Sequence, residues 1–455
     1  MIPSNANFDA MNVGVARKIN YLIEIVGYPK KFTFRKDADP VHYPWIQETS
    51  GMGNLSQQAN LLDGTSSLST CELTLLDKDG QLLASFPSFT FRGKQITIKA
   101  GFEGLAESDY VTLATLVIDR VHSSENTTCF TFECSDNSRL VSNTVYDIGD
   151  DGQAVSSDHL RTVSGNPMDI LLDVLGNELG LPDVRINLTQ VNAYRNGLLA
   201  GLRMEFQLDS APEAQQFLDQ EIFKALGGYS FENYAGQYTP FFLIPSSATT
   251  AAISLSDRNI QEPLPTPTLP EIQNLISYGY DFRNGSDFAR RLVIEDAVSR
   301  ATYGLSNLQV IESHGMKSLL GASTYIRLLA NAIFLRYGYE APTIELVANW
   351  DACLLELGDR ISITHSLLPN RVLGTRGLTN SIWEVVGREY EWHAGLVHLN
   401  LLNVDWLAAT PIYQFAPDAI PSWPTASAAQ RAQYMFVASA ATGKYSDGTE
   451  GHLIP

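Results

Sequence analysis

The sequence predicts a mainly β protein with an α+β insertion, in which two β-barrel-like domains per chain flank a small α+β module. Short runs that alternate apolar and polar residues fill residues 17–160 and 271–410. This period of two is typical of strands. Between the two regions the apolar residues recur with the longer period of a helix. The chain has 455 residues, enough for about three domains.

Residues 1–160 are predicted to form the first barrel-like domain. RKINYLIEIVG has the pattern of a strand, and SLSTCELTLLDKDGQLL that of two strands around a corner at Asp77-Lys78-Asp79-Gly80. Further alternating runs are KQITIKAGF, VTLATLVIDRV and CFTFECSD. Several short strands at even spacing favour a barrel or a sandwich.

Residues 161–261 are predicted to form the α+β module. In NPMDILLDVLGNELGLP the apolar residues share one helical face, Asn166 suits the N-cap and Pro167 the first helical position. Ser210 and Glu213 form a capping-box pattern that predicts the start of a second helix. YSFENYAGQYTPFFLI then predicts a hairpin with Ala235-Gly236 at its tip.

Residues 262–270, EPLPTPTLP, are predicted to be a stiff, proline-rich linker. Residues 271–410 are predicted to form the second barrel-like domain, interrupted by one helix at TYIRLLANAIFLRYG. Asn284-Gly285 suits the tip of a hairpin in this domain. Residues 411–455 are predicted to be an extended C-terminal arm. Its aromatic residues make it too apolar for a purely solvated tail, and we expect Trp423, Tyr434 and Phe436 to bind a partner.

The segment LELGDRISITH, residues 355–365, brings together residue types that hydrolases use: Glu356, Asp359, Ser362 and His365. Gly358-Asp359 is typical of a turn, and the alternation that follows is typical of a strand. Residues three apart in a regular strand point to opposite faces, so Ser362 and His365 should not meet. We therefore expect the solvated start of a strand and no catalytic residues here.

Other motif searches predict neither catalysis nor a cofactor. The sequence contains no GxSxG elbow, no HExxH helix and no P-loop. His393 and His398 lack an obvious third ligand, so we expect no metal site. Cys71, Cys129, Cys134 and Cys353 have no paired CxxC spacing and are expected to be buried free thiols. Paired carboxylates for glycan cleavage remain an open alternative, because a chain with 50 acidic residues always offers some pair.

The charge balance bears on possible partners. The chain holds 31 Lys and Arg against 50 Asp and Glu, a net charge of −19. Such a surface is repelled by phosphates, so specific binding of DNA or of an anionic membrane is not expected. A passage through which DNA slides without sticking remains compatible with this charge. MIPSNANFDAMNVGVARK lacks a signal pattern, and no apolar run approaches a membrane span, so we expect a soluble protein made in the cytoplasm.

Several stretches, taken in order, resemble tail-hub (baseplate-hub) proteins of tailed bacteriophages and related gene-transfer particles. LTLLDKDGQLL, GKQITIKAGF and LATLVIDRV resemble the first barrel of that family, and NPMDILLDVLGNELGLP the helix after it. LLELGDRISITHSLLPN and RGLTNSIWEVVGREYEW resemble the second barrel. The ending ATGKYSDGTEGHLIP is similar to the ends of some such proteins. The resemblance covers roughly residues 17–410 and this ending.

The resemblance implies a structural virion component, a homotrimeric hub that joins the tail tube to the tail tip and lines the channel for DNA passage. It implies as partners a tail-tube or distal tail protein and a tail-tip or central fibre protein, with a tape-measure protein as a further candidate. Its place would be the virion tail, assembled in the bacterial host cytoplasm. Two alternatives stay open: a tail-associated glycan- or peptide-cleaving enzyme, and a carbohydrate-binding adhesin that uses Tyr229, Phe231, Tyr234 and Tyr238.

Overall fold

The fold was examined in a computed structural model of the chain. The residues it describes are 1–12, 18–35, 42–46, 51–67, 69–123, 128–136, 141, 143–243, 251–261, 271–283, 287–320, 322–370, 375–404, 414–415, 425, 427 and 434–435. Met1–Ile244 and Thr250–Asn403 form one unit, and Pro245–Thr249 with Val404–Pro455 form another.

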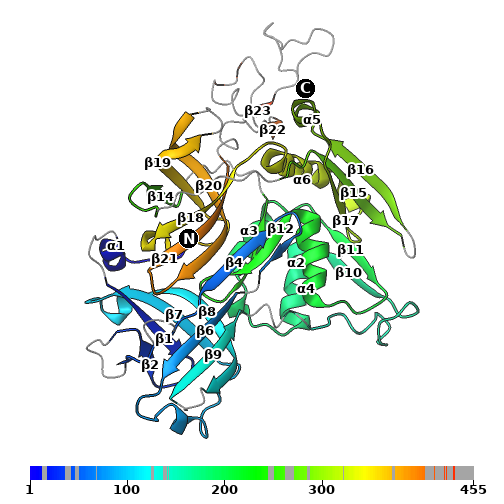
Figure 1. The fold of residues 1–455 in the computed structure, drawn as a ribbon. Coiled ribbons are helices and arrows are strands. Elements are labelled where there is room, and N and C mark those ends of the chain that lie inside the picture. The colour runs from blue at the N-terminus through cyan, green and yellow to red at the C-terminus, as the bar shows by residue number, and fades with distance from the viewer. Residues whose placement is uncertain are drawn as a thin grey trace. The chain divides into compact units, whose positions relative to one another are not determined.

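The first β region is one seven-stranded sheet in the order β3-β2-β1-β7-β8-β9-β6 (Figure 1). Its strands are β1 (Ile19–Ile25), β2 (Lys31–Thr33), β3 (His42–Tyr43), β6 (Thr70–Leu76), β7 (Gln95–Phe102), β8 (Val111–Ser123) and β9 (Cys129–Ser135). The two edges of the sheet are joined, because Leu76 N–H donates to the Trp45 carbonyl at 2.7 Å and Thr74 N–H to that of Gly51 at 2.7 Å. The predicted barrel-like form is therefore confirmed.

The second β region contains two sheets. The larger of the two has its main strands in the order β14-β19-β20-β21-β18. Its strands are β14 (Ile253–Ser256), β18 (Thr343–Asn349), β19 (Arg360–Asn370), β20 (Thr375–Glu391) and β21 (Leu396–Asn403). The segment after β14 returns to β18, where Gln261 N–H donates to the Val347 carbonyl at 2.8 Å and Asn349 N–H to that of Asn259 at 2.7 Å. Residues 253–261, which the sequence analysis assigns to the module, thus close this sheet.

Two strands from the first 160 residues also belong to the second sheet. β4 (Leu55–Asn60) pairs with residues 387–390 of β20 (Figure 1) and with the short β5 (Thr65–Ser66). β20 can serve two partners because a bulge between Val385 and Gly387 separates the part paired with β19 from the part paired with β4.

The module joins short helices to two pairs of antiparallel strands, β10–β11 and the β12–β13 hairpin. Its elements are β10 (Arg161–Gly165), α2 (Pro167–Leu172), α3 (Leu188–Asn196), β11 (Met204–Leu208), α4 (Ala214–Phe217), β12 (Gly228–Glu232) and β13 (Tyr238–Phe242). α2 and α4 each continue as a π-helical turn, over Asp173–Glu178 and Leu218–Lys224. Asn166 caps α2, accepting a hydrogen bond from Met168 N–H at 2.9 Å with Pro167 in the first turn, as the sequence predicted.

Two local predictions of helix and strand are wrong. Ser210 does not start a helix: its hydroxyl contacts Asp209, and α4 begins after Glu213 without a side-chain cap. The predicted strand after Asp77 is a short 3₁₀ turn, Leu83–Ser85. The Asp77 carboxylate accepts the backbone N–H groups of Leu82 and Leu83, each at 2.9 Å. These bonds satisfy the donors that a hairpin strand would have paired.

The rest of the second β region is a separate three-stranded sheet in the order β16-β15-β17. It comprises β15 (Leu275–Phe282), β16 (Phe288–Glu295) and β17 (Leu308–Glu312), with α5 (Ala297–Tyr303) and α6 (Ala322–Tyr337). The sequence analysis predicted α6 but missed α5. Asp296 caps α5 by accepting two backbone N–H bonds, and Gly304 ends it at φ 66°, a left-handed conformation that glycine adopts without strain.

Among the described residues, the remaining α-helix is α1 (Ala6–Asn12), and the remaining strands are the paired two-residue β22 (Gln414–Phe415) and β23 (Tyr434–Met435). The linker 262–270 and the tip Asn284-Gly285 lie outside the described residues. Within the part of the chain that is described, no helix combines the length and apolarity needed to cross a membrane.

Candidate functional site

The segment LELGDRISITH forms a turn and the start of β19, as predicted. The prediction that this start is solvated is wrong, because Ser362 and His365 are 6% and 5% exposed. The Ser362 hydroxyl bonds that of Ser254 on β14 at 2.6 Å. His365 Nδ1 instead accepts the Leu367 N–H at 3.1 Å and lies 3.4 Å from the Asp257 carboxylate.

The reason lies in a register shift between Ile363 and His365, which interrupts the alternation of faces. Side chains three positions apart can then both be buried. Ser362 and His365 still have different partners on different segments. The geometry therefore agrees with the expectation that they do not form a nucleophile–base pair.

The two β regions are joined by four buried aromatic residues, here called the junction cluster: Tyr21, Trp350, Tyr390 and Trp392. Tyr21 comes from β1, whereas the other three come from the second region. The Tyr21 ring meets those of Trp350 and Trp392 edge-on, with centroids 5.6 and 5.4 Å apart. Its hydroxyl donates to the Trp392 carbonyl at 2.7 Å. Each of the four side chains is 1% exposed or less, so the cluster is a dry contact.

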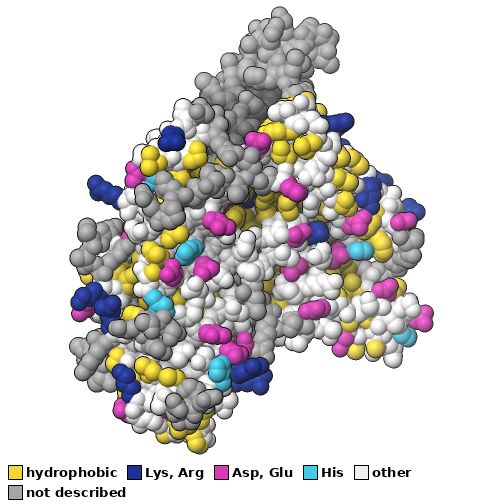
Figure 2. All heavy atoms as spheres, viewed as in Figure 1, with side chains coloured by type: hydrophobic (Ala, Val, Ile, Leu, Met, Phe, Trp, Pro, Cys, Tyr) yellow, Lys and Arg dark blue, Asp and Glu magenta, His cyan; other side chains and the backbone are white. Residues whose placement is uncertain are grey.

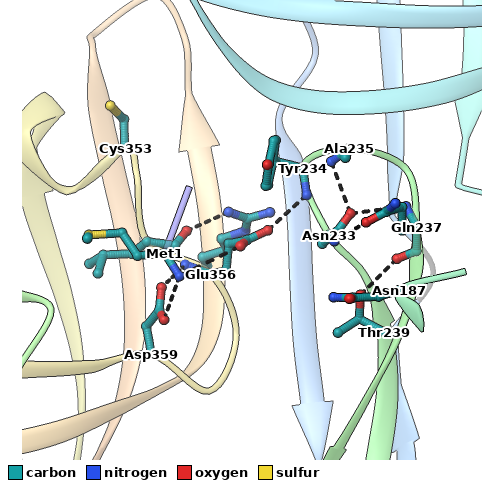
Figure 3. A network of polar contacts seen from close by, with 12 residues as sticks. Met1, Asn187, Asn233, Tyr234, Ala235, Gln237, Thr239, Cys353, Glu356 and Asp359 are labelled. Atoms are coloured by element: carbon teal, nitrogen blue, oxygen red, sulfur yellow. Dashed lines mark hydrogen bonds and ion pairs between the residues drawn. The ribbon is translucent and has the colours of Figure 1, made fainter. Parts of the chain in front are cut away.

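A polar network extends this junction to the module (Figure 3). At the tip of the β12–β13 hairpin, Asn233 Oδ1 accepts the N–H groups of Ala235 and Gln237, each at 3.0 Å. The neighbouring Tyr234 N–H donates to the Glu356 carboxylate at 2.8 Å. The carbonyl of Tyr234 accepts the Thr115 hydroxyl of β8 at 3.0 Å. One hairpin tip thus bonds to both β regions.

The turn before β19 forms the other side of this network. The Asp359 carboxylate accepts the Glu356 N–H at 2.8 Å and contacts the Met1 amino group at 2.7 Å (Figure 3). Arg388 lies buried nearby, donating to Gln57 Oε1 at 2.9 Å and to the Tyr390 hydroxyl at 3.0 Å. Both acidic residues are thus bonded to other groups of the fold.

A second buried charge pair lies between α6 and β20. Arg336 Nη1 donates to Glu384 Oε1 at 2.8 Å, a second bond joins Arg336 Nη2 to Glu384 Oε2, and the two residues are 3% and 1% exposed. Burial alone would lower the pKa of Arg336, but the Glu384 carboxylate outweighs burial and raises it. This salt bridge pairs a guanidinium with a carboxylate, so the two residues together add no net charge to this part of the core.

A wide groove of about 1390 Å³ lies between the module and β17. A pair of residues bridges it: His314 Nδ1 is 2.6 Å from Glu221 Oε1. The hydrogen bond to Glu221 raises the pKa of His314, although partial burial opposes this. Glu205, Asp209 and Glu213 add further carboxylates to the lining. The lining of this groove therefore has mixed charge, and its imidazole is bonded to a carboxylate.

Apolar side chains gather on the outer face of the three-stranded sheet and beside α5 (Figure 2). Val293, Leu308 and Val310 are 59%, 50% and 44% exposed. The register places Val293 and Val310 on either side of Ser277, in one row across the sheet. Exposed apolar residues that gather on one face mark a candidate contact surface.

Nothing in the described part of the chain groups three or more His, Cys, Asp or Glu residues so that they could hold a metal ion. His398 was considered as a metal ligand from the sequence. Its Nε2 instead lies 2.9 Å from the Glu391 carboxylate. None of the four cysteines forms a disulfide with another described residue, and three are buried, whereas Cys129 is half-buried. Burial raises the pKa of Cys71 to about 12, which keeps its thiol protonated.

The predicted partner-binding residues cannot be placed as side chains. Trp423 and Phe436 lie outside the described residues, and Tyr434 is described only as part of β23. Tyr229 and Tyr238, which a carbohydrate-binding face would need on the surface, are 1% and 4% exposed. Phe231 and Tyr234 are half-buried. The four residues therefore do not form an exposed aromatic face.

Sequence reasoning missed the junction cluster and the two buried charge networks. Tyr21 and Trp392 are 371 positions apart, and no local period reports such a contact. Buried Arg336 and Arg388 were also missed, although an arginine within an otherwise apolar or alternating run is a signal of a buried partner.

Comparison with known proteins gives structural likeness only. No protein-family model and no curated protein matches the chain. The tail protein from Neisseria meningitidis MC58 is 10% identical, with a TM-score of 0.47, over 86% of this chain and 98% of that one. The prophage MuSo2 43 kDa tail protein from Shewanella oneidensis is 12% identical, with a TM-score of 0.45, over 85% and 99%.

The prophage tail protein gp18 from Listeria monocytogenes EGD-e is 8% identical, with a TM-score of 0.45, over 84% of this chain and 94% of that one. All three structures are described as tail proteins. The mainly β fold is confirmed by the strands and sheets themselves.

Proposed function

We propose that the chain is a structural component of a phage-type tail, a homotrimeric hub that joins the tail tube to the tail tip. The observation that carries the proposal is the junction cluster, which fastens two barrel-like sheets of one chain through a buried contact. A structural part requires such a fixed relation between its two halves. An enzyme requires a catalytic site instead.

The presence of two β sheets in each chain is also compatible with a closed ring of several chains. Three chains with two similar β units each present six units, and repeated contacts around a closed ring require similar surfaces at each step. Such a ring could match a six-fold tube, as the sequence resemblance implies. The exposed apolar side chains of Val293, Leu308 and Val310 form a surface that such contacts could use.

A non-enzymatic role fits the bonding of the acidic and imidazole groups. Glu356 and Asp359 hold a turn to a hairpin tip, and His365 accepts a backbone N–H. Each of these groups already has a structural partner. The alternative of a tail-associated cleaving enzyme has no specific observation in its favour.

Within this proposal the hub lies in the virion tail and is assembled in the host cytoplasm. It contacts a tail-tube or distal tail protein and a tail-tip or central fibre protein, with a tape-measure protein as a further candidate. The net charge of −19 would keep DNA moving through a channel without binding. Residues 411–455, with Trp423, Tyr434 and Phe436, are proposed to bind one of these partners.

Electron microscopy of the purified full chain tests the proposal. Two-dimensional averages should show a ring with three-fold symmetry and six similar β units around an opening. The matched control is Trp392→Ala, which removes one side chain of the junction cluster. In its averages the position of one β unit relative to the other unit of the same chain should be less well defined. Averages of single chains, or of two-fold pairs, would contradict the hub.

A further inference from the structure

A second cavity, here called the β4–β5 pocket, lies apart from the groove and from the junction cluster. Its volume is about 590 Å³, which is within the range of about 300–1,000 Å³ typical of small-molecule sites. Its wall is formed by the β4–β5 hairpin, and Arg336, Glu384 and Tyr229 also line it. The pocket is thus assembled from the first 67 residues, the module and the second β region.

The Tyr229 hydroxyl is the unusual feature of the pocket. Tyr229 is 1% exposed, and its oxygen has no hydrogen-bond partner among the described residues. The ring is held by stacking on Phe241, with centroids 4.9 Å apart. A buried hydroxyl without a partner costs free energy, so a group that enters the pocket and bonds to it would recover that cost.

The charge of the lining selects the class of ligand. Arg336 and Glu384 are the charged residues of the lining, and they are paired with each other. A charged ligand would lose its hydration without finding an unpaired counter-charge, which is unfavourable. The ligand should therefore be neutral.

The remaining lining combines polar and apolar groups. Gln58, Asn60, Thr65 and Ser67 offer amides and hydroxyls, whereas Leu61 and Leu402 are aliphatic. A sugar combines hydroxyl groups around its ring with apolar C–H faces. The Arg336–Glu384 pair presents donors and acceptors side by side, which suits neighbouring hydroxyls that each donate and accept.

We propose that the β4–β5 pocket binds a neutral saccharide, whose hydroxyls bond to Tyr229 and to the Arg336–Glu384 pair. The site lies within one chain and does not depend on the hub function or on trimer formation. It also differs from the exposed aromatic face that an adhesin would need, because its specificity comes from a buried hydroxyl and a neutral ion pair.

Saturation-transfer NMR and titration calorimetry on the full chain test the site. The probes are glucose, galactose, N-acetylglucosamine and maltose, with glucuronate as the charged counterpart of glucose. At least one neutral probe should bind saturably, and glucuronate at least about tenfold more weakly than glucose. Tyr229→Phe should weaken binding about tenfold, the effect of one lost buried hydrogen bond.

Tyr238→Phe is the matched control, because Tyr238 is a buried tyrosine of the paired strand that does not line the pocket. It should leave binding unchanged. Tyr229→Phe removes a hydroxyl without a partner, so its melting temperature should not fall. Absence of saturable binding for every neutral probe, equal binding by Tyr229→Phe, or equal binding of glucuronate would each overturn the proposal.

Discussion

The Tyr21 hydroxyl of β1 donates a 2.7 Å hydrogen bond to the main-chain carbonyl of Trp392, which lies 371 positions later in the chain. Both residues are 1% exposed. This buried bond is one of the contacts that join the first β region to the second, and it lies inside a cluster of aromatic rings.

Tyr21→Phe should lower the free energy of unfolding by about 1–3 kcal/mol, because the buried Trp392 carbonyl loses its donor while the ring packing is kept. Urea unfolding followed by tryptophan fluorescence measures the change. The control is Tyr28→Phe, because Tyr28 is only half-buried and its bond to Ser85 is a longer 3.3 Å. An effect of Tyr21→Phe no larger than that of the control would show that the junction bond does not stabilise the fold.

Asp219 gives the fold a pH dependence. Burial raises its pKa to about 6, although a bond from the Gln215 amide opposes the shift. In the unfolded chain the value is about 3.9, so between these two values the folded state binds more protons than the unfolded state. Stability should therefore fall as the pH rises from about 4 to about 6.

Asp219→Asn removes this titration and keeps an oxygen for the Gln215 amide. The variant should be more stable than the wild type at pH 7, and the difference should shrink as the pH is lowered to 4. Thermal melts at several pH values measure it. A constant difference across this range would place the pKa of Asp219 near its ordinary value.

His365→Ala and Asp359→Ala should leave any glycan or peptide cleavage by the assembled particle unchanged. His365 accepts a backbone N–H, and Asp359 accepts that of Glu356, so both act within the fold. The variants should instead melt at lower temperature. Loss of cleavage by a variant with an unchanged melting temperature would reveal a catalytic site in this segment.

Truncation after Thr410 should give a folded chain with nearly unchanged thermal stability and oligomeric state. Met1–Ile244 with Thr250–Asn403 forms a unit separate from Val404–Pro455, and the strands of the second sheet end at Asn403. The truncated chain should fail to incorporate into tails, because each large apolar side chain buried on docking contributes about 1.5–3 kcal/mol.

A variant in which Trp423, Tyr434 and Phe436 are all replaced by Ser keeps the length of the arm. It therefore separates the loss of these side chains from the loss of the arm itself. It should fail in assembly as the truncation does. A truncated chain that melts many degrees lower would place the arm in the core of its own chain, and normal assembly would show that the arm is inert.

Local patterns predicted local structure well where a single segment decides it. The Asn166 cap of α2, the β12–β13 hairpin and α6 follow from residues that are neighbours in sequence. The local predictions that failed did so because of hydrogen bonds and register shifts that the alternation of residues does not show. Asp77 captures two backbone donors and replaces a strand, and a register shift in β19 buries both Ser362 and His365.

Contacts distant in sequence could not be predicted. β4 leaves the first 160 residues to pair with β20, and residues 259–261 return to close the second sheet. In both cases an alternating run shows that a strand exists but not which strand it pairs with. The β4–β5 pocket was missed for the same reason, because Tyr229, Arg336 and Glu384 come from three segments.

The hub proposal is tested most directly by the mass of the purified full chain in solution, measured by light scattering across a micromolar concentration series. We expect a mass three times that of the 50.1 kDa chain, independent of concentration in that range. A mass equal to that of one chain, or twice that mass, would contradict the trimeric hub.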